Sequence, residues 1–373
     1  MPTALVTDCW TNKALSVVRS LGLAGLEVHA AAHKRTGAAL YSRFVAKRFI
    51  VSTPEELLRL VRGSRYDCVM PLEDETIRLL QAARDIPPGL VSLPPIDSLR
   101  IASDKLATWR LAVAVGVPVP RSAQGVAEAL AELTFPMILK PLHSSGSRGV
   151  VRVTNEAELI ARESEIASRF GPSFIQEALP ASGAGLGVGL IADRGRVLNA
   201  YAYRRLREFP VSGGPSTLRE TIEAPELIRH AARLMQALDW TGVAMVEFKT
   251  DVREGVACLL EINPRFWGSL ELAAVAGMNF PWMLFKLTRG EPIERVEART
   301  GVRCRWLLPG DLAHFIANPR RFSLDPSFFR FFDATTHYDD FKGYDVRGSV
   351  ATMSCAFLSL FDPETWKLGV FRR

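Results

Sequence analysis

The sequence predicts an α/β fold built from more than one domain. Short apolar, β-prone segments alternate with helical segments over the first 71 residues, and a β-hairpin is indicated much later, between residues 243 and 263. With 373 residues and a hydrophobic content of 48%, the chain can bury the cores of two or three domains. We therefore expect a parallel sheet near the N-terminus and a separate unit that contains the hairpin.

The N-terminal region alternates strand and helix in the order expected for a parallel sheet with crossover helices. It contains no G-x-G-x-x-G sequence, so it is a weak candidate for dinucleotide binding. The strands are expected at Ala4–Thr7, Glu27–Ala31, Arg48–Val51 and Cys68–Pro71, and the helices at Asn12–Leu21 and Pro54–Arg62.

Three acidic residues lie at the predicted carboxyl ends of these strands, the edge where open parallel sheets form ligand crevices. Asp8 follows the first strand, and Glu73 and Asp74 follow the last one. Each of them either caps a neighbouring helix, which we favour, or contacts the amine of a substrate.

A lysine ends the strand predicted at Phe135–Lys140. A loop rich in glycine and serine, residues 143–149, separates this strand from another at Val150–Val153. The loop lacks the G-x-x-x-x-G-K-[ST] sequence and does not open a helix, so it is not a P-loop. It is either a plain turn or a segment whose backbone N–H groups cover phosphates above the charge of Lys140.

Residues 243–263 comprise two β-prone segments separated by turn-forming residues, which predicts a hairpin. If the hairpin closes about Glu254, Glu247 and Glu261 lie opposite each other, because each is seven residues from that point. The period-two alternation of a strand then brings Asn263 to the same face.

Two opposed carboxylates repel each other, since the Cβ atoms of a cross-strand pair are about 4.5–5.5 Å apart, and a cation between them relieves the repulsion. Mg²⁺ typically takes one or two protein carboxylates and completes its shell with phosphate oxygens and water. Glu247, Glu261 and Asn263 are therefore predicted metal ligands. The alternative is a solvated strand face, on which Lys249 also lies.

Arg265, two residues after Asn263, is the one cation that the sequence places beside this face. Its planar guanidinium suits a phosphate group or a developing oxyanion. The alternative is a structural pair in which Arg265 binds Glu261 and holds the end of the strand.

The chain changes in character after Gly290, because residues 291–373 are rich in phenylalanine, arginine and tryptophan. The phenylalanines of Phe328–Phe332 either pack a C-terminal helix onto the core, which we favour, or form a dimer face. The segment His337–Phe341 has the composition of an acid/base cluster, but a histidine beside aromatic residues is usually structural.

The net charge of +6 does not indicate nucleic-acid binding, since the chain has no basic run of five or more residues. The modest excess suits attraction of anionic ligands. Five cysteines, far apart and odd in number, favour a reducing cytosol over a disulfide framework. No signal peptide and no apolar run of about 18 residues is recognised, so we expect a cytoplasmic protein outside the membrane.

The order of these motifs resembles the ATP-grasp superfamily, in its branch of carboxylate–amine ligases similar to the large chain of carbamoyl-phosphate synthetase. The resemblance covers about residues 1–290. It implies a Rossmann-like pre-ATP-grasp domain in residues 1–102 and an ATP-grasp domain in 103–290, whose lid spans about 120–178. A C-terminal extension, residues 291–373, packs on the core. The fold class is thus α/β, with an α+β core.

The resemblance implies ATP as a ligand, held by segments that precede the hairpin. Two lysines match those that contact the nucleotide phosphates, a Gly/Ser loop covers the phosphates, and the end of a later strand hydrogen-bonds adenine. In that order, the implied ATP-binding residues are Lys105 and Lys140, then Ser145, Gly146, Ser147 and Gly149, then Gln176 and Glu177. Many members hold ribose with a glutamate shortly after the adenine segment, but residues 181–187 contain no acid.

The three predicted metal ligands match those of the family, which bind Mg²⁺, with Mn²⁺ as a substitute. Arg265 matches the arginine that steadies the transferred phosphate or the acyl intermediate. Arg205 lies in Arg204–Glu208, which together with Ser212–Ser216 resembles the loop that closes over phosphate and substrate. The implied catalytic residues are therefore Arg265 and Arg205.

The implied reaction is an ATP-dependent ligation. A substrate carboxylate attacks the γ-phosphorus to give an acylphosphate and ADP, and an amine then displaces phosphate. The alternatives are a kinase or a carboxylase with the same fold, or a nucleotide-responsive binding protein that performs no ligation. We expect small-molecule carboxylate and amine substrates, no nucleic-acid or membrane partner, and we leave a homodimer open.

Overall fold

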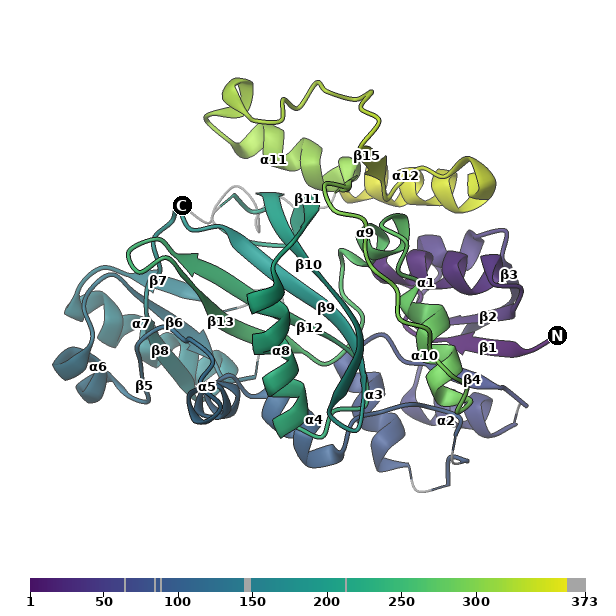
Figure 1. The fold of residues 1–373 in the computed structure, drawn as a ribbon, viewed down its shortest axis with the longest axis horizontal. Helices are drawn as coiled ribbons and strands as arrows, with labels where there is room; N and C mark the ends of the chain where they lie inside the picture. The colour runs from purple at the N-terminus through teal and green to yellow at the C-terminus, as the bar shows by residue number, and fades with distance from the viewer. Residues whose placement is uncertain (64, 84, 88, 144–148, 212, 361–373) are drawn as a thin grey trace.

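Three β-sheets organise the chain (Figure 1). The structure is a computed structural model that describes residues 1–360 except 64, 84, 88, 144–148 and 212. A four-stranded sheet contains the N-terminus, a second four-stranded sheet lies at the opposite end of the molecule, and a seven-stranded sheet lies between them.

The N-terminal sheet is parallel, as the alternating pattern predicts, with the strand order β3-β2-β1-β4. Leu5 at its centre has no exposed surface, because the strands are apolar and helices cover the sheet. The strands are β1 Thr3–Val6, β2 Glu27–Ala32, β3 Val45–Ile50 and β4 Cys68–Met70. The helices are α1 Asn12–Leu23, η1 Ala38–Tyr41, α2 Pro54–Gly63 and α3 Asp74–Ala82.

Two helices, α4 Ile96–Ser103 and α5 Lys105–Ala114, lead to the second four-stranded sheet, which is antiparallel with the order β5-β8-β6-β7. Leu139, Leu159 and Ile175 form part of the small core beneath its two helices. Its elements are β5 Ser122–Ala123, α6 Val126–Glu132, β6 Met137–Pro141, β7 Val151–Val153, α7 Glu156–Phe170 and β8 Ser173–Glu177.

The seven-stranded sheet has the order β13-β12-β9-β10-β11-β14-β15 and is antiparallel except for its last pair. Its hairpin, β12 and β13, lies where the sequence predicts it. The strands are β9 Gly185–Asp193, β10 Arg196–Glu208, β11 Ser216–Ile222, β12 Gly242–Asp251, β13 Val256–Asn263, β14 Arg303–Arg305 and β15 Thr336–Tyr338.

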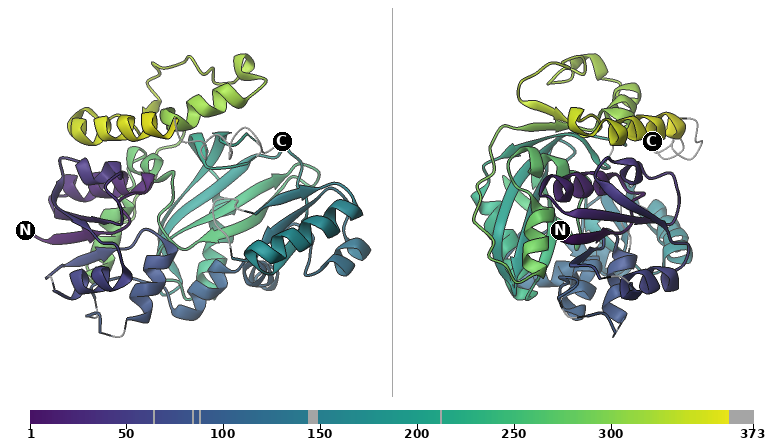
Figure 2. Two further views of the ribbon diagram at one scale, coloured as in Figure 1. Left: turned by 180° about the vertical axis from the view of Figure 1, so that it is seen from behind. Right: turned by 90° about the vertical axis from the view of Figure 1, so that its right-hand side faces the viewer.

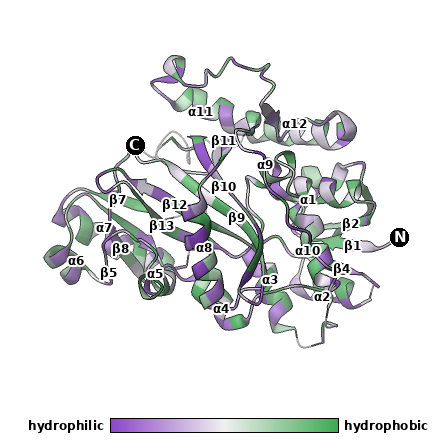
Figure 3. Cartoon of the chain, viewed as in Figure 1, coloured by the Kyte–Doolittle hydropathy of each residue, from purple (hydrophilic) through white to green (hydrophobic). Residues whose placement is uncertain are grey.

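The two faces of this sheet pack against different parts of the chain. On one face, Val188 and Val246 meet the amphipathic helix α8, Pro225–Ala237, along which hydrophobic and hydrophilic residues alternate (Figure 3). On the other face, Tyr201 and Trp267 share a core with the N-terminal sheet. Helices α9 Leu270–Val275 and α10 Phe280–Thr288 complete that second face.

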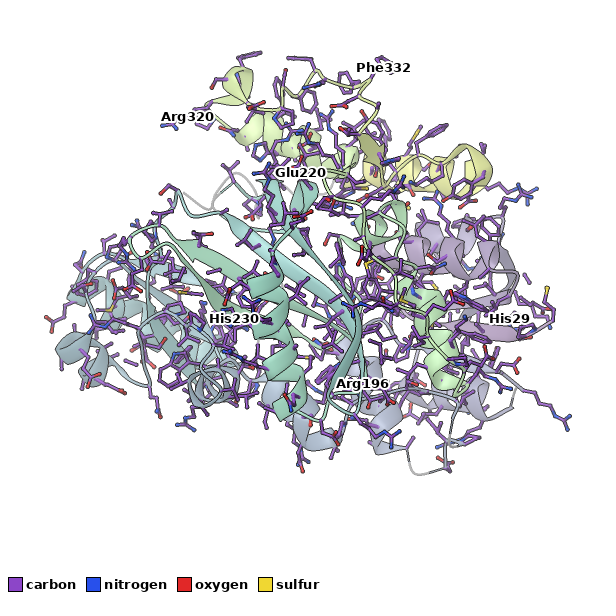
Figure 4. The ribbon with its side chains drawn as sticks, viewed as in Figure 1. His29, Arg196, Glu220, His230, Arg320 and Phe332 are labelled. Atoms are coloured by element: carbon purple, nitrogen blue, oxygen red, sulfur yellow. The ribbon has the colours of Figure 1, made fainter. Side chains whose placement is uncertain are left out.

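The C-terminal segment lies as a layer across one side of the molecule, above β11 and α1 (Figures 1 and 2). Phe328 is buried and stacks on Phe315 of the same layer. Phe329 and Phe332 are exposed, and Figure 4 shows Phe332 on the outer side of the layer. The layer contains η2 Leu307–Asp311, α11 Leu312–Ala317, η3 Arg321–Ser323, η4 Gly343–Asp345 and α12 Val346–Leu360.

A polar stripe on α1 joins distant parts of the chain. It comprises Lys13, Ser16 and Arg19, which are three residues apart and therefore share one side of the helix. All three side chains are buried. Their partners, each within 2.9 Å, are Glu73, Glu271 and Asp345, respectively.

All five cysteines are free thiols, as their spacing predicts. Within the described ranges, no helix is both long enough and apolar enough to cross a bilayer.

Candidate active site

The hairpin brings the two predicted carboxylates together. Glu247 on β12 pairs with Glu261 on β13, as predicted, but the hairpin does not close symmetrically about Glu254. A β-bulge follows this pair, because Phe248 opposes Leu259 and leaves one extra residue on β13. The two carboxylates consequently lie on the same face of the sheet, turned towards the N-terminal sheet.

Asn263 joins the two carboxylates on that face, as predicted. Its Nδ2 lies 3.3 Å from Oε1 of Glu247 and 3.2 Å from Oε1 of Glu261. Burial raises the pKa of Glu261, and the charge of Glu247 raises it further against the opposing effect of Lys105. The cluster therefore holds two like charges in a partly buried position, which costs free energy.

Two lysines face this cluster. Lys105, at the start of α5, has its Nζ 3.9 Å from Oε2 of Glu261. Lys140 near the end of β6 donates to Oε1 of Gln176 at 2.5 Å. Burial lowers the pKa of Lys140 to about 8, although the charge of Glu261 opposes this effect. These contacts bring Lys105, Lys140 and Gln176 to one side of the hairpin, in the order that the resemblance implies.

Among the described residues, Arg205 is the cation that contacts the predicted metal face most closely. Its Nη2 lies 2.6 Å from Oε2 of Glu247, and its Nη1 lies 3.5 Å from Oε1 of Glu208. The resemblance to a closing loop is wrong for Arg204–Glu208, since these residues belong to β10 and pair with β11, and Arg204 also pairs with β9. Of the second predicted loop segment, Ser216 begins β11 and position 212 lies outside the described residues.

Glycines on β9 allow Arg205 to reach Glu247, because β9 lies between β10 and β12 in the sheet. A Cβ atom on Gly185 would lie 2.9 Å from Oε1 of Glu208 and 3.2 Å from Cδ of Arg205, and one on Gly187 would overlap the ring of Tyr203. Glycine occurs at every second position of β9 from Gly185 to Gly189, a period-two pattern that is visible in the sequence.

Arg265 does not pair with Glu261 as the structural alternative expects. Its Nε lies 3.4 Å from Oδ1 of Asp74 and 3.8 Å from Oε2 of Glu73, and its Nη1 donates to the carbonyl of Phe266 at 3.1 Å. Arg265 is therefore beside the N-terminal sheet, and the expectation that it is the one cation at the metal face is wrong.

The acidic residues of the N-terminal sheet have three different environments. Asp8 accepts from the backbone N–H groups of Leu72 and Glu73 and from Oγ1 of Thr76, so it fixes the turn before α3. Glu73 is the N-cap residue of α3, but its side chain makes no capping hydrogen bond. Capping is therefore wrong for Glu73, which pairs with Lys13 at 2.8 Å. Asp74 lies in the first turn of α3, beside Arg265.

A cavity of about 420 Å³ lies between the N-terminal sheet and the end of the hairpin. Glu261 and Asn263 line it on one side, and Asp74 and Ser103 line it on another. Oγ of Ser103 is buried without a hydrogen-bond partner among the described residues, and Oδ1 of Asp74, also without one, faces Nε of Arg265 at 3.4 Å. Cavities of this size and mixed polarity are typical of small-molecule sites.

A larger hollow, of about 560 Å³, lies between η2 and α12. None of its described lining residues is charged; they include Leu308, Met353 and Phe357. It lies away from the hairpin carboxylates and offers no group suited to binding phosphate or metal, so the smaller cavity is the candidate site.

The adenine residues predicted at the end of β8 already have partners. Gln176 accepts from Lys140 and donates to Oγ of Ser122 at 2.9 Å, and Oε1 of Glu177 lies 2.6 Å from Nη1 of Arg253 in the hairpin turn. In the predicted phosphate loop, Ser145, Gly146 and Ser147 lie outside the described residues. Gly149 has a φ of 71°, a conformation that favours glycine.

Three residues of the segment His337–Phe341 have structural contacts. Tyr338 donates to the carbonyl of Phe331 at 2.7 Å, and Asp339 lies 2.6 Å from Nη2 of Arg219. Asp340 accepts from the backbone N–H groups of residues 307 and 308. These contacts fix β15 and the following turn onto the sheet.

The donor set of the hairpin fits Mg²⁺ brought by a nucleotide. Among the described residues, no group of three or more His, Cys, Asp or Glu side chains is arranged to hold a metal ion. Two carboxylates with one amide suit a hard cation whose shell is completed by phosphate oxygens. The amide of Asn263 would present Oδ1 rather than Nδ2 to the ion, which requires only a rotation of the amide group.

Comparison with known proteins identifies the fold. Residues 169–308 match the family described as ATP-grasp in the biosynthetic pathway with Ter operon. The chain has the ATP-grasp fold. The N5-carboxyaminoimidazole synthetase of Staphylococcus aureus, solved in complex with ADP, has a TM-score of 0.67 at 14% identity. The similarity covers 87% of this chain and 86% of that one, which confirms the predicted fold class.

Curated ATP-grasp relatives are similar over part of the chain. The D-alanine–D-alanine ligase of Pseudomonas entomophila strain L48 is 28% identical over 178 residues, which cover 44% of this chain and 54% of that protein. The large chain of carbamoyl phosphate synthase from Methanothrix thermoacetophila is 25% identical over 240 residues, or 57% and 21% of the two chains. The chain thus spans about half or less of these relatives, whose names are those of a ligase and a synthase.

Proposed function

We propose that the chain is an ATP-dependent carboxylate–amine ligase that forms ADP and phosphate. The observation that carries the proposal is the convergence of Glu247, Glu261 and Asn263 with Lys105 and Arg205. Glu261, Asn263 and Lys105 also line the 420 Å³ cavity. A triphosphate and a carboxylate are both anions, so an enzyme that joins them must position them and offset their repulsion.

In this proposal the residues of the ATP-grasp domain, 103–290, bind the nucleotide. Lys105 and Lys140 hold the phosphates, and Gln176 and Glu177 lie at the edge of the adenine site. Mg²⁺, when bound by the three hairpin residues, would neutralise charge on the triphosphate. Residues 1–102 form the opposite wall of the substrate cavity, and the described part of the C-terminal extension, residues 291–360, packs against the sheet.

The two arginines have separate roles. Arg205 is placed to stabilise charge on the transferred phosphate, because its guanidinium already lies against a carboxylate of the metal face. Arg265 lies between the metal face and the N-terminal sheet, where it would bind the substrate carboxylate. The carboxylate attacks the γ-phosphorus, ADP leaves, and an amine then displaces phosphate from the acylphosphate.

The carboxylates of Glu73 and Asp74 favour an amine in the same cavity. Both lie on the wall formed by α3, and Oδ1 of Asp74 has no hydrogen-bond partner among the described residues. An ammonium group bound there would add a hydrogen bond to Oδ1 of Asp74, which already lies 3.4 Å from Nε of Arg265.

The test is ADP release with Mg-ATP and pools of amino acids and small carboxylic acids, with hydroxylamine added to trap an acylphosphate. Hydroxamate formation with one acid is the expected result and identifies the carboxylate substrate. Transfer of phosphate to a product that does not react with hydroxylamine would support a kinase instead. Turnover that requires bicarbonate would support a carboxylase, and binding of Mg-ATP without ADP release from any pool would support a binding protein.

A further inference from the structure

Asp311 is a buried carboxylate that joins three strands of the seven-stranded sheet. It accepts from Nε and Nη2 of Arg207 on β10 at 2.7 and 2.8 Å. It also accepts from Oγ1 of Thr217 on β11 at 2.9 Å and from Nε of Arg305 on β14 at 2.6 Å. Because Asp311 has no exposed surface, these hydrogen bonds fix the ends of the three strands relative to one another.

His314, one turn further along the C-terminal layer, contacts the next residue of β10. Its Nδ1 donates to the carbonyl of Glu208 at 2.7 Å, and its Nε2 accepts from Nδ2 of Asn318 at 3.0 Å. The ring is thus held from both sides, with one nitrogen as donor and the other as acceptor. His314 is buried, so water does not compete readily for either hydrogen bond.

Asp311 and His314 contact Arg207 and Glu208, which follow Arg205 by two and three residues on β10. A β-bulge between Arg205 and Arg207 adds a residue to β10, so the pairing with β11 alone is irregular here. The side chain of Glu208 also lies 3.5 Å from Nη1 of Arg205. The contact from Arg205 to Glu247 therefore depends on a strand end whose position is set by Asp311 and His314.

We infer that Asp311 and His314 form a clamp that positions Arg205 at the metal face. They are positioning residues, because neither contacts the cavity, and the inference rests on the proposed function of Arg205. The C-terminal extension is thereby part of the construction of the active site, in addition to packing on the sheet.

The test compares ADP release by His314→Leu and by His314→Asn, using Mg-ATP and the carboxylic acid identified by the pooled assay. His314→Leu removes both hydrogen bonds and is expected to lower kcat about 10- to 100-fold with little change in KM for ATP. His314→Asn is expected to regain most of the loss, because its Nδ2 can donate to the carbonyl of Glu208. Asp345→Asn is the control, since it disturbs a buried pair of the same extension with α1 rather than with β10.

A double-mutant cycle separates positioning from general stability. In an Arg205→Gln background, His314→Leu is expected to have no further effect on kcat, because the residue it positions is gone. If His314→Leu lowered kcat by the same factor in the Arg205→Gln background as in the wild type, the inference would be overturned. A loss in Asp345→Asn as large as that in His314→Leu would also overturn it.

Hydrogen exchange measured by mass spectrometry tests the clamp independently of turnover. Residues 203–208 are expected to exchange faster in His314→Leu than in the wild type or in Asp345→Asn. Unchanged exchange there would overturn the clamp even if the wild type is an active ligase. If the wild type released no ADP but His314→Leu still showed the faster exchange, the proposed function of Arg205 would be refuted. Only the contact between the extension and β10 would then remain.

Discussion

Charged residues are arranged differently on the two sides of the seven-stranded sheet. On the β11–β14 side, the buried side chains of Arg219 and Glu220 each meet an opposite charge: Arg219 lies 2.6 Å from Asp339, and Glu220 lies 2.8 Å from Arg303. Figure 4 shows Glu220 at the junction between the sheet and the C-terminal layer. On the hairpin side, two carboxylates face each other, and burial with mutual repulsion raises the pKa of Glu261.

This comparison distinguishes charges that stabilise the fold by pairing from charges that a bound ligand would neutralise. Opposite charges that neutralise each other do not need a bound molecule to offset the cost of burial. Two partly buried carboxylates repel each other, and Arg205 and Lys105 offset this cost in free energy only in part. A bound cation would relieve the repulsion at the hairpin, whereas the paired charges on the other side need none.

The strongest test of this contrast is Glu261→Gln. We expect the rate of ADP release to fall at least about 10²–10³-fold, as on loss of a group that stabilises transition-state charge. The free energy of unfolding, measured in urea, is expected to stay the same or to rise, because the variant removes a charge that is costly to bury.

Glu254→Gln is the matched control for Glu261→Gln, since Glu254 is exposed in the turn of the same hairpin. It is expected to change neither quantity. If Glu261→Gln retained activity and lost several kcal/mol of stability instead, the hairpin carboxylates would be structural like those on the other side.

The second test concerns the β11–β14 side, where removing a charge is expected to lower stability. Asp339→Ala leaves the guanidinium of Arg219, whose side chain is only 1% exposed, without its carboxylate. We expect the free energy of unfolding to fall by about 3–5 kcal/mol. Glu165→Ala, which disrupts the exposed Arg162–Glu165 pair, serves as control and is expected to cost less than about 1 kcal/mol. A loss for Asp339→Ala no larger than the control's would refute the structural assignment.

A smaller effect is expected from Gly187→Ala, which tests the path of side chains from β10 to the hairpin. The added methyl group overlaps the ring of Tyr203, so we expect a loss of about 1–3 kcal/mol from overpacking, together with slower ADP release. Gly125→Ala is the control, because its Cβ would meet no atom within 4 Å. Equal stability of the two variants, measured by urea unfolding, would show that β9 tolerates side chains here.

A pH-dependent effect concerns Asp340, beside the paired charges. Burial, and next the charge of Asp339, raise the pKa of Asp340 to about 7. Between about pH 4 and 7 the folded state then binds a proton that the unfolded state has lost, so stability falls as pH rises, by at most about 1.4 kcal/mol per pH unit.

Asp340→Asn keeps an oxygen for the two backbone N–H groups and cannot titrate, so we expect a flatter pH dependence of the urea-unfolding free energy. Asp97→Asn, at an exposed i,i+3 pair, provides the comparison. An unchanged slope in Asp340→Asn would mean that other groups cause the pH dependence.

The sequence predicts local structure well because strands, helices and turns depend on neighbouring residues. The parallel N-terminal sheet and the hairpin are both confirmed, and so is the pairing of Glu247 with Glu261. The bulge on β13 is missed, since one extra residue leaves the apolar pattern almost unchanged. The pairing is nevertheless correct because this bulge offsets the true position of the turn.

Long-range contacts of single side chains are not predictable from such patterns. Arg207 and Asp311 are 104 residues apart, and no periodicity links them. The expected position of Arg265 fails for the same reason, because its partners come from α3, far earlier in the chain. The glycines of β9 are different, since their spacing is visible in the sequence but becomes meaningful only when the neighbouring strands are known.

The polar stripe on α1 has a consequence for the order in which the protein matures during synthesis. The helix emerges early from the ribosome, but Ser16 and Arg19 meet their partners, Glu271 and Asp345, across 255 and 326 residues of chain. A buried guanidinium without a carboxylate is costly, so Arg19 must keep its water until the partner arrives. The N-terminal sheet can therefore reach its final packing only after the chain has been made as far as Asp345.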